Sequence, residues 1–141
     1  MNKGDEMQKL FKQAYQEVID LHKQIENLFH NKTDDSGRLP FLSYFHSDFT
    51  MIPPDGVLRD FSWLRNWFES AAGSRPQVKI SIEHFKENFA CEECVMVTFE
   101  EYQQVSVQES LRRLSTAILV PTDNSKQPLL WRHLHETWVK K

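Results

Sequence analysis

The stretch Leu129-Leu-Trp-Arg-His-Leu-His-Glu-Thr-Trp-Val139 decides what fold to expect for this chain of 141 residues. It predicts a strand, in which successive side chains point to opposite faces of a sheet. One face would carry Trp131, His133, His135, Thr137 and Val139, and the other Leu130, Arg132, Leu134, Glu136 and Trp138. Each face mixes apolar bulk with polar groups. We therefore expect this strand to be covered on both sides and to line a cavity on one of them.

Three more strand-like segments lie before it. Apolar residues alternate with polar ones over residues 78–83, and residues 94–107 and 112–120 are rich in β-branched and aromatic side chains. The connections between these segments are short, which suits antiparallel neighbours and not parallel ones. The carboxy-terminal half therefore predicts a meander of four antiparallel strands.

The amino-terminal half predicts helices. Apolar residues recur at steps of three and four over residues 7–29, with Asp5 as the expected N-cap. Residues 38–45 predict a shorter helix, residues 48–52 and 57–58 predict a strand pair around a Pro-Pro-Asp-Gly turn, and Asp60 is placed to cap a third helix. Helices followed by consecutive strands indicate the α+β class with an antiparallel sheet.

Composition limits the classes of function. The length predicts a single domain spanning 1–141, with residues 1–4 disordered. A net charge of -3 without a Lys/Arg block argues against nucleic-acid binding. No apolar run reaches the roughly 20 residues of a membrane span, and the amino terminus is too polar for a signal peptide. We expect a cytoplasmic protein that binds neither nucleic acid nor membrane.

Four segments carry a resemblance to a known family: residues 45–56, 73–76, 99–103 with 113–117, and 131–138. Together with the order helix, helix, strand pair, helix, four strands, they resemble the nuclear transport factor 2-like superfamily, also called SnoaL-like. They look like an uncharacterised bacterial branch related to the calcium/calmodulin-dependent kinase association domain. The resemblance implies a cystatin-like cone, in which a strongly curved antiparallel sheet wraps around the amino-terminal helices and leaves a pocket.

The same resemblance says little about activity, because the fold hosts isomerases, dehydratases, cyclases and binding domains. The ketosteroid isomerase branch has a catalytic aspartate before a proline-containing turn. The matching position here falls near Pro53, which cannot take a proton. A tyrosine of the first helix donates a hydrogen bond in that branch. Tyr15 could do the same here, or could be a core tyrosine with its hydroxyl at the rim.

The middle strands hold a polar cluster of Glu100, Tyr102, Arg113 and Ser115. It predicts either a site for a small polar or anionic ligand inside the cone or cross-strand pairs on the surface. Both alternatives stay open, because the sequence does not decide which strand parity faces inward. Trp63 and Trp67 lie on the apolar stripe of the third helix and are core residues or part of a pocket wall.

His133 and His135 have the spacing of metal ligands on a strand, but a metal would need a third ligand such as Glu100 or His84. We predict no metal and no cofactor, with both histidines hydrogen-bonded and a ring nitrogen aimed into the pocket. Cys91-Glu-Glu-Cys94 has redox spacing in the wrong context, between two strands, and its glutamates would raise a thiol pKa. We interpret it as a turn with two ordinary thiols.

These observations predict a protein that binds a small, partly apolar molecule in the cone. Its ligand-binding residues would be Tyr15, Trp63, Trp67, Glu100, Tyr102, Arg113, Ser115, His133 and His135. One alternative is a cofactor-free lyase, isomerase or hydrolase with His135 or His133 as general acid–base and Tyr15 or Tyr102 as donor. Another is a ligand-free homo-oligomeric association module. The apolar residues on both sheet faces also predict a homodimer through the outer face.

Overall fold

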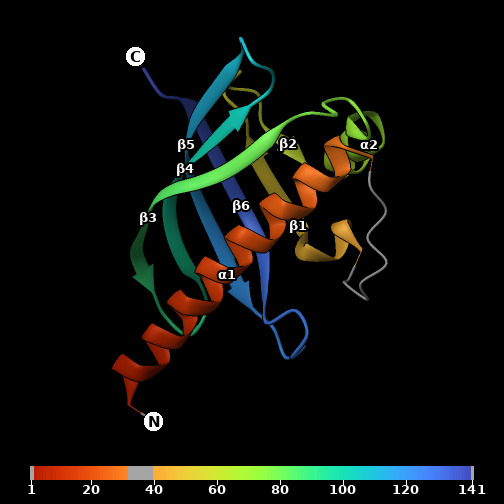
Figure 1. The fold of residues 1–141 in the computed structure, drawn as a ribbon. Helices are drawn as coiled ribbons and strands as arrows, with labels where there is room; N and C mark the ends of the chain where they lie inside the picture. Colours follow the sequence, from red (N-terminus) through yellow and green to blue (C-terminus); the bar gives the residue numbers. More distant parts are fainter. Residues whose placement is uncertain (1, 32–39, 141) are drawn as a thin grey trace.

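The computed structural model describes residues 2–31 and 40–140, and Figure 1 shows its elements. One long helix, a short 3-10 helix and a second helix accompany a sheet of six strands. In chain order they are α1 (Lys3–Phe29), η1 (Phe41–Tyr44), β1 (Phe45–Ile52), β2 (Arg59–Asp60), α2 (Phe61–Ala71), β3 (Lys79–Ala90), β4 (Val95–Gln104), β5 (Ser110–Pro121) and β6 (Leu129–Trp138). The predicted α+β order is confirmed.

Helix α1 begins earlier than the sequence predicts. The Asn2 side chain is the N-cap, because its Oδ1 accepts a hydrogen bond from the backbone N–H of Asp5 at 2.8 Å. Asp5 therefore lies in the first turn, where its carboxylate complements the helix dipole. Asp60 caps α2 as expected, accepting from the backbone N–H of Trp63 at 2.9 Å.

The segment before β1 differs from its prediction. The expected helix over 38–45 is the single 3-10 turn η1, which follows Pro40, and residues 38–39 lie outside the described residues. The returning strand is β2, two residues later than predicted.

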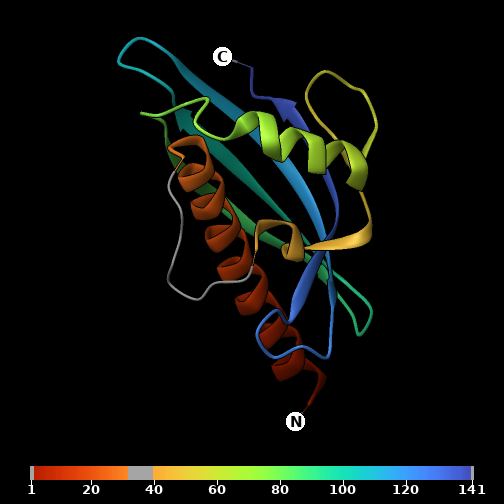
Figure 2. The ribbon, with the colours of Figure 1, turned by 90° about the vertical axis from the view of Figure 1, so that its right-hand side faces the viewer.

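The strands form one sheet in the order β2-β1-β6-β5-β4-β3. The pairs among β3, β4, β5 and β6 are antiparallel, as predicted, but β1 pairs with β6 in parallel, so the sheet is mixed. The sheet curves around α1, and α2 lies across its other end on the same side (Figure 2). This arrangement is the predicted curved sheet wrapped around helices.

One irregularity in β6 changes which side chains face the helices. Leu119 of β5 pairs with Trp131, while its neighbour Ile118 pairs with His133, so Arg132 is an extra residue in β6. Such a bulge inverts the alternation of every residue beyond it. Trp131 faces inward, and so do Leu134, Glu136 and Trp138 beyond the bulge.

The core fills the half of the cone nearest the start of α1. Its fully buried residues come from α1, β4, β5 and β6, and they include Ala14, Val18, Val95, Val97, Ala117 and Trp131. Aromatic rings of η1 and β1 continue this core toward α2, with Phe41 stacked on Phe68 at 5.1 Å between ring centroids. Among the described residues, no helix has the length and apolar character to cross a membrane.

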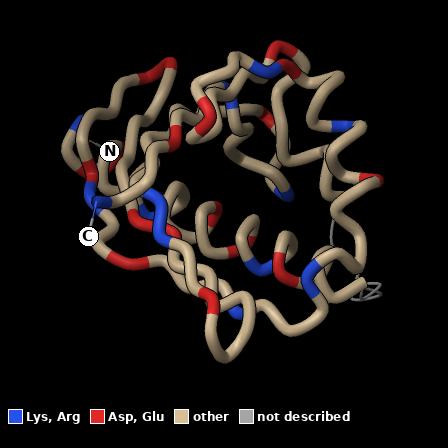
Figure 3. The backbone as a smooth tube through the Cα atoms, turned by 90° about the horizontal axis from the view of Figure 1, so that it is seen from above, with Lys and Arg blue, Asp and Glu red and all other residues tan. Residues whose placement is uncertain are grey.

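Acidic and basic residues alternate along the chain and do not gather on one side (Figure 3). The described residues therefore form no continuous basic surface of the kind that binds a phosphate backbone.

Candidate functional site: a polar-floored cavity between the sheet and α2

A cavity of about 500 Å³ occupies the end of the cone covered by α2. Its wall is largely aromatic and aliphatic, with Phe29 from α1, Phe49 and Met51 from β1, and Trp63 and Trp67 from α2. Its floor is polar and comes from α1 and from the inner faces of β4, β5 and β6. A volume in this range with mixed lining suits a small organic molecule.

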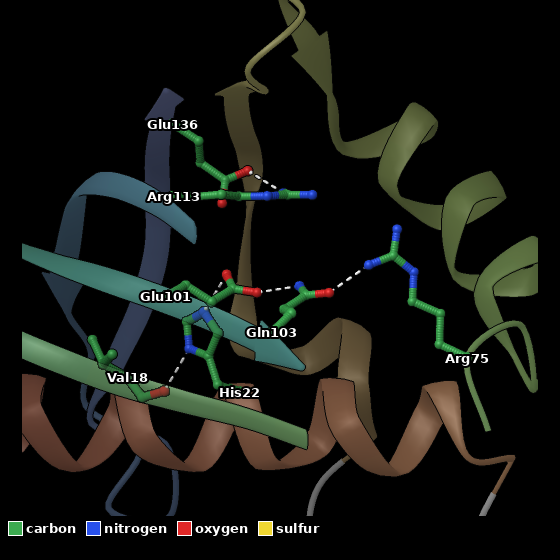
Figure 4. Close-up of polar contacts among 7 residues, drawn as sticks. All are labelled: Val18, His22, Arg75, Glu101, Gln103, Arg113 and Glu136. Carbon is green, nitrogen blue, oxygen red and sulfur yellow. Dashed lines mark hydrogen bonds and ion pairs between the residues drawn. The ribbon is translucent and has the colours of Figure 1, made fainter. Parts of the chain in front are cut away.

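The deepest part of the floor is an ion pair between a helix and a strand. The Nε2 of His22 on α1 lies 3.1 Å from the Oε1 of Glu101 on β4, and both side chains are 5% exposed. The other ring nitrogen of His22, Nδ1, donates to the carbonyl oxygen of Val18 at 2.7 Å. Figure 4 shows the imidazole held between these two acceptors. Because both nitrogens face acceptors, this geometry favours the imidazolium form.

The second Glu101 oxygen extends the network toward α2. The Gln103 side-chain amide donates to Oε2 of Glu101, and its carbonyl oxygen accepts from Nη1 of Arg75. Arg75 follows α2 and also lies over the Phe29 ring at 5.3 Å. The chain His22–Glu101–Gln103–Arg75 therefore links α1 to the segment after α2 across one wall of the cavity (Figure 4).

Arg113 and Glu136 form a second ion pair on the floor. Nη1 of Arg113 donates to Oε1 of Glu136 at 3.2 Å, and Glu136 is only 4% exposed. The Arg113 guanidinium also lies 5.1 Å from the ring of Trp138. Its Nε is buried without a hydrogen-bond partner. An unpaired buried donor is costly, so an acceptor that reached this atom would relieve that cost.

The two floor carboxylates have opposite pKa shifts. Burial alone would raise the pKa of Glu101, but His22 and Arg113 outweigh it and lower that pKa to about 2. Burial, reinforced by the charge of Glu101, raises the pKa of Glu136 to about 7. Burial would lower the pKa of His22, yet the charge of Glu101 raises it. Glu101 is therefore a fixed anion at neutral pH, and Glu136 exchanges its proton there.

Three of the residues predicted from the sequence lie at this cavity: Trp63, Trp67 and Arg113. Pro53, which replaces the aspartate of the ketosteroid isomerase branch, also lines it and supplies no ionisable group.

The structure places His133 and His135 on the outer face of the sheet. The bulge at Arg132 turns them away from the helices, so the predicted orientation into the pocket is wrong for both. The Nδ1 of His133 lies 2.8 Å from the Thr50 hydroxyl of β1, and His135 is exposed. Neither ring is within the cavity where a pocket acid–base would have to act.

The remaining predicted residues also lie elsewhere. Glu100 and Tyr102 are on the outer face, where Arg112 donates to Glu100 at 3.1 Å and lies over the Tyr102 ring at 5.0 Å. Ser115 is fully buried on the inner face but does not line the cavity. Tyr15 is 48% exposed and packs edge-on against Phe85, away from the cavity.

Sequence reasoning missed the polar residues that form the hydrogen-bonded and ion-paired network of the site beside Arg113: His22, Arg75, Glu101, Gln103 and Glu136. His22 carried a signal, since it interrupts the apolar stripe of α1. Glu101 and Gln103 lie on the same face of β4 as Val97 and Phe99. Assigning these two apolar residues to the inner face would therefore have placed Glu101 and Gln103 inside the cone as well. Nothing in the local pattern around Glu136 reveals the bulge that turns it inward.

A group of possible metal-ligating side chains in the described part of the chain consists of Glu83, His84 and Glu100. Arg112 already donates to both glutamates, at 2.7 Å to Glu83 and 3.1 Å to Glu100. The guanidinium therefore neutralises this exposed cluster, which explains the arrangement through ordinary ion pairs.

The chain has the class of fold in which a curved sheet and helices enclose a cone. It matches no protein-family model and no curated protein. It is similar to the solved structure of an NTF-2-like protein of unknown function from Pseudomonas aeruginosa, with 26% identity over 91% of this chain and 99% of that one, and a TM-score of 0.82.

Two further structures share the fold at lower identity. A hub homology domain of the calcium/calmodulin-dependent kinase type from Chlamydamonas reinhardtii is 15% identical, covers 90% of this chain and 99% of its own, and has a TM-score of 0.66. A putative ketosteroid isomerase from Parabacteroides distasonis is 16% identical over 87% of this chain and 86% of its own, with a TM-score of 0.60. The resemblance seen in the sequence is thus confirmed: the chain has the nuclear transport factor 2-like fold.

Proposed function

We propose that the cavity binds a small, partly apolar molecule that carries an anionic group. The observation that carries this proposal is the Arg113 guanidinium, which lies on the polar floor opposite a largely aromatic wall and whose buried Nε has no partner among the described residues. A carboxylate beside this guanidinium would gain a charge-assisted hydrogen bond.

Arg75 supports the same ligand chemistry from the opposite wall. Arg75 donates to the neutral side chain of Gln103, so this hydrogen bond does not offset the positive charge of its guanidinium. The cavity lining holds two arginines and the His22 imidazolium against the carboxylates of Glu101, Glu136 and Asp55. Their charges sum to zero with Glu136 ionised and to a positive value once Glu136 is protonated. The aromatic wall would bury the apolar part of the ligand.

Isothermal titration with phenylacetate and its uncharged analogue phenylacetamide tests the proposal. The wild-type chain should bind the carboxylate at least about tenfold more tightly than the amide, as expected for one charge-assisted hydrogen bond. Arg113→Gln should remove this preference and leave the amide affinity unchanged. That variant should fold, because Glu136 already has a raised pKa and can become neutral when its partner is lost.

Arg112→Gln is the matched control, since Arg112 is the neighbouring arginine of β5 on the opposite face. It should leave both affinities unchanged. Equal affinity of the wild type for the two probes, or no effect of Arg113→Gln on phenylacetate, would contradict an anion site at Arg113.

A second candidate function, self-association, is favoured by the outer face of the sheet. This face presents apolar residues that the helices do not cover, among them Phe89 at 54% exposed and Leu114 at 47%. Two of the similar structures are hub domains of the calcium/calmodulin-dependent kinase type. We infer that a second copy of this chain covers the outer face in an isologous dimer.

Sedimentation at micromolar concentration distinguishes a dimer from a 16.7 kDa monomer. Leu114→Glu should shift the equilibrium to the monomer, because it would bury a charge in the interface. Leu58→Glu, at a leucine that is 65% exposed in the loop between β1 and β2, should leave the dimer intact. A wild-type chain that sediments only as the monomer would exclude this interface.

A further inference from the structure

The turn between β3 and β4 places two thiols face to face. Cys91 and Cys94 flank the Glu92–Glu93 turn, and the Cys91 backbone N–H donates to the Cys94 carbonyl oxygen at 2.9 Å. Their sulfur atoms lie 4.0 Å apart, and both residues are partly exposed. A disulfide bond needs the two sulfurs about 2 Å apart, so the thiols have only a short distance to close.

The two thiols are not equivalent. Backbone hydrogen bonds from Glu93 and Cys94 to the Cys91 sulfur lower the pKa of that thiol. Burial raises the pKa of Cys94, and the neighbouring Cys91 and Glu93 raise it further. The charge of Glu93 raises the pKa of both thiols, as the sequence predicts, but at Cys91 the backbone hydrogen bonds outweigh it and the net shift is downward. A turn that aims its amides at one sulfur supplies the anion stabilisation that a helix amino terminus gives in other two-thiol motifs.

We propose that Cys91 and Cys94 form a reversible redox pair, in which Cys91 attacks a low-molecular-weight disulfide and Cys94 closes the internal bond. The Cys91 thiolate displaces one thiolate from the small disulfide, giving a mixed disulfide. Cys94 then loses its proton and attacks the Cys91 sulfur, releasing the second small thiol. Two protein thiols are oxidised to one disulfide, and one small disulfide is reduced to two thiols.

This site is independent of the ligand cavity. The pair lies at the β3–β4 turn, and neither cysteine lines the cavity at the α2 end of the cone. Oxidation would cross-link a turn that is already paired, so the cone should keep its shape. A test of the redox pair therefore has an outcome that does not depend on the proposed anion site.

Intact-mass spectrometry of the full chain in oxidised and reduced glutathione, after acid quenching, tests the pair. The wild type should lose two hydrogen atoms, carry no glutathione and be restored by dithiothreitol. Cys94→Ser should accumulate a glutathione adduct on Cys91 faster than Cys91→Ser accumulates one on Cys94. Site-resolved alkylation of the two variants with iodoacetamide should give the same order, because the thiolate is the nucleophile in both reactions.

Glu93→Gln should speed oxidation of the wild-type pair several-fold, because Glu93 raises the pKa of both thiols. Glu92→Gln is its matched control and should change the rate less. A wild-type chain that ends with glutathione on both cysteines, or with no change, would overturn the pair. Equal rates for the two single variants would overturn the assignment of Cys91 as the attacking thiol.

Discussion

Glu17 and Glu136 are two buried carboxylates at opposite ends of the same cone, and burial raises the pKa of each to about 7. Their surroundings differ. Glu17 lies at the filled end, where its Oε1 accepts from Gln127 at 2.8 Å and from the indole of Trp131 at 3.3 Å. Glu136 lies at the hollow end beside Arg113, whose Nε has no partner.

This difference separates a structural carboxylate from one that a ligand can use. At the filled end, neutral donors satisfy Glu17, and its ionisation costs only stability. At the hollow end, the charge of Glu136 competes with any incoming anion for the same guanidinium. The raised pKa therefore predicts a stability effect in both regions and, at the hollow end, an effect on ligand binding as well.

The largest expected effect comes from removing the side chain that closes the filled end. Trp131 is fully buried and contacts both Glu17 and the ring of His22. Trp131→Ala should lower the free energy of unfolding by about 3–5 kcal/mol, because it leaves a cavity and removes a donor from a buried carboxylate. Urea denaturation measures this loss.

Trp138→Ala is the control for the hollow end, since Trp138 is 48% exposed. It should cost well under half as much. Equal losses for the two tryptophans would mean that the two ends of the cone are not packed differently.

A smaller effect is expected on the pH dependence of stability. The Glu17 pKa is raised in the folded state, so the unfolded state binds fewer protons between the ordinary value of 4.5 and about 7. Stability should therefore fall as the pH rises through this window. Glu17→Gln should remove the contribution of Glu17 to that fall, leaving that of Glu136, and gain up to about 3 kcal/mol relative to the wild type above pH 7. Urea denaturation from acidic to neutral pH tests it, and parallel curves for both proteins would refute it.

The smallest effect concerns ligand binding at Glu136. Phenylacetate stays ionised over the range in which Glu136 titrates, so it should bind most tightly when Glu136 is protonated. We expect wild-type affinity to fall up to about tenfold from about pH 6 to about pH 8, and Glu136→Gln to bind with little pH dependence. Titration calorimetry measures both. Glu17→Gln should keep the wild-type pH dependence of phenylacetate affinity. If it lost that dependence, the two carboxylates would not differ in the way described.

Much of the fold was predictable because it rests on local chemistry. Asp60 caps α2 as its position before an apolar stripe predicts, and the four long strands follow from alternation and short connections. The parallel pairing of β1 with β6 was not predictable, because these strands lie far apart in the chain. Only the closing of the sheet brings them together.

The site was predicted only in part. Trp63 and Trp67 were found because an apolar helix stripe is a local signal. Arg113 was among the candidates, but the sequence left open whether its strand parity faces inward. His22, Arg75, Glu101 and Gln103 act as a set assembled from three separate segments. No single segment carries the pattern of that set.

The sequence alone determined that helices precede a strand meander and that the last strand would be covered on its inner side. The tertiary structure alone decided which polar residues of that strand meet the cavity. A strand alternates with a period of two, so the one extra residue at Arg132 exchanges the two faces beyond it. Glu136 thereby takes the place inside the cone that the unbroken alternation gives to His133 and His135.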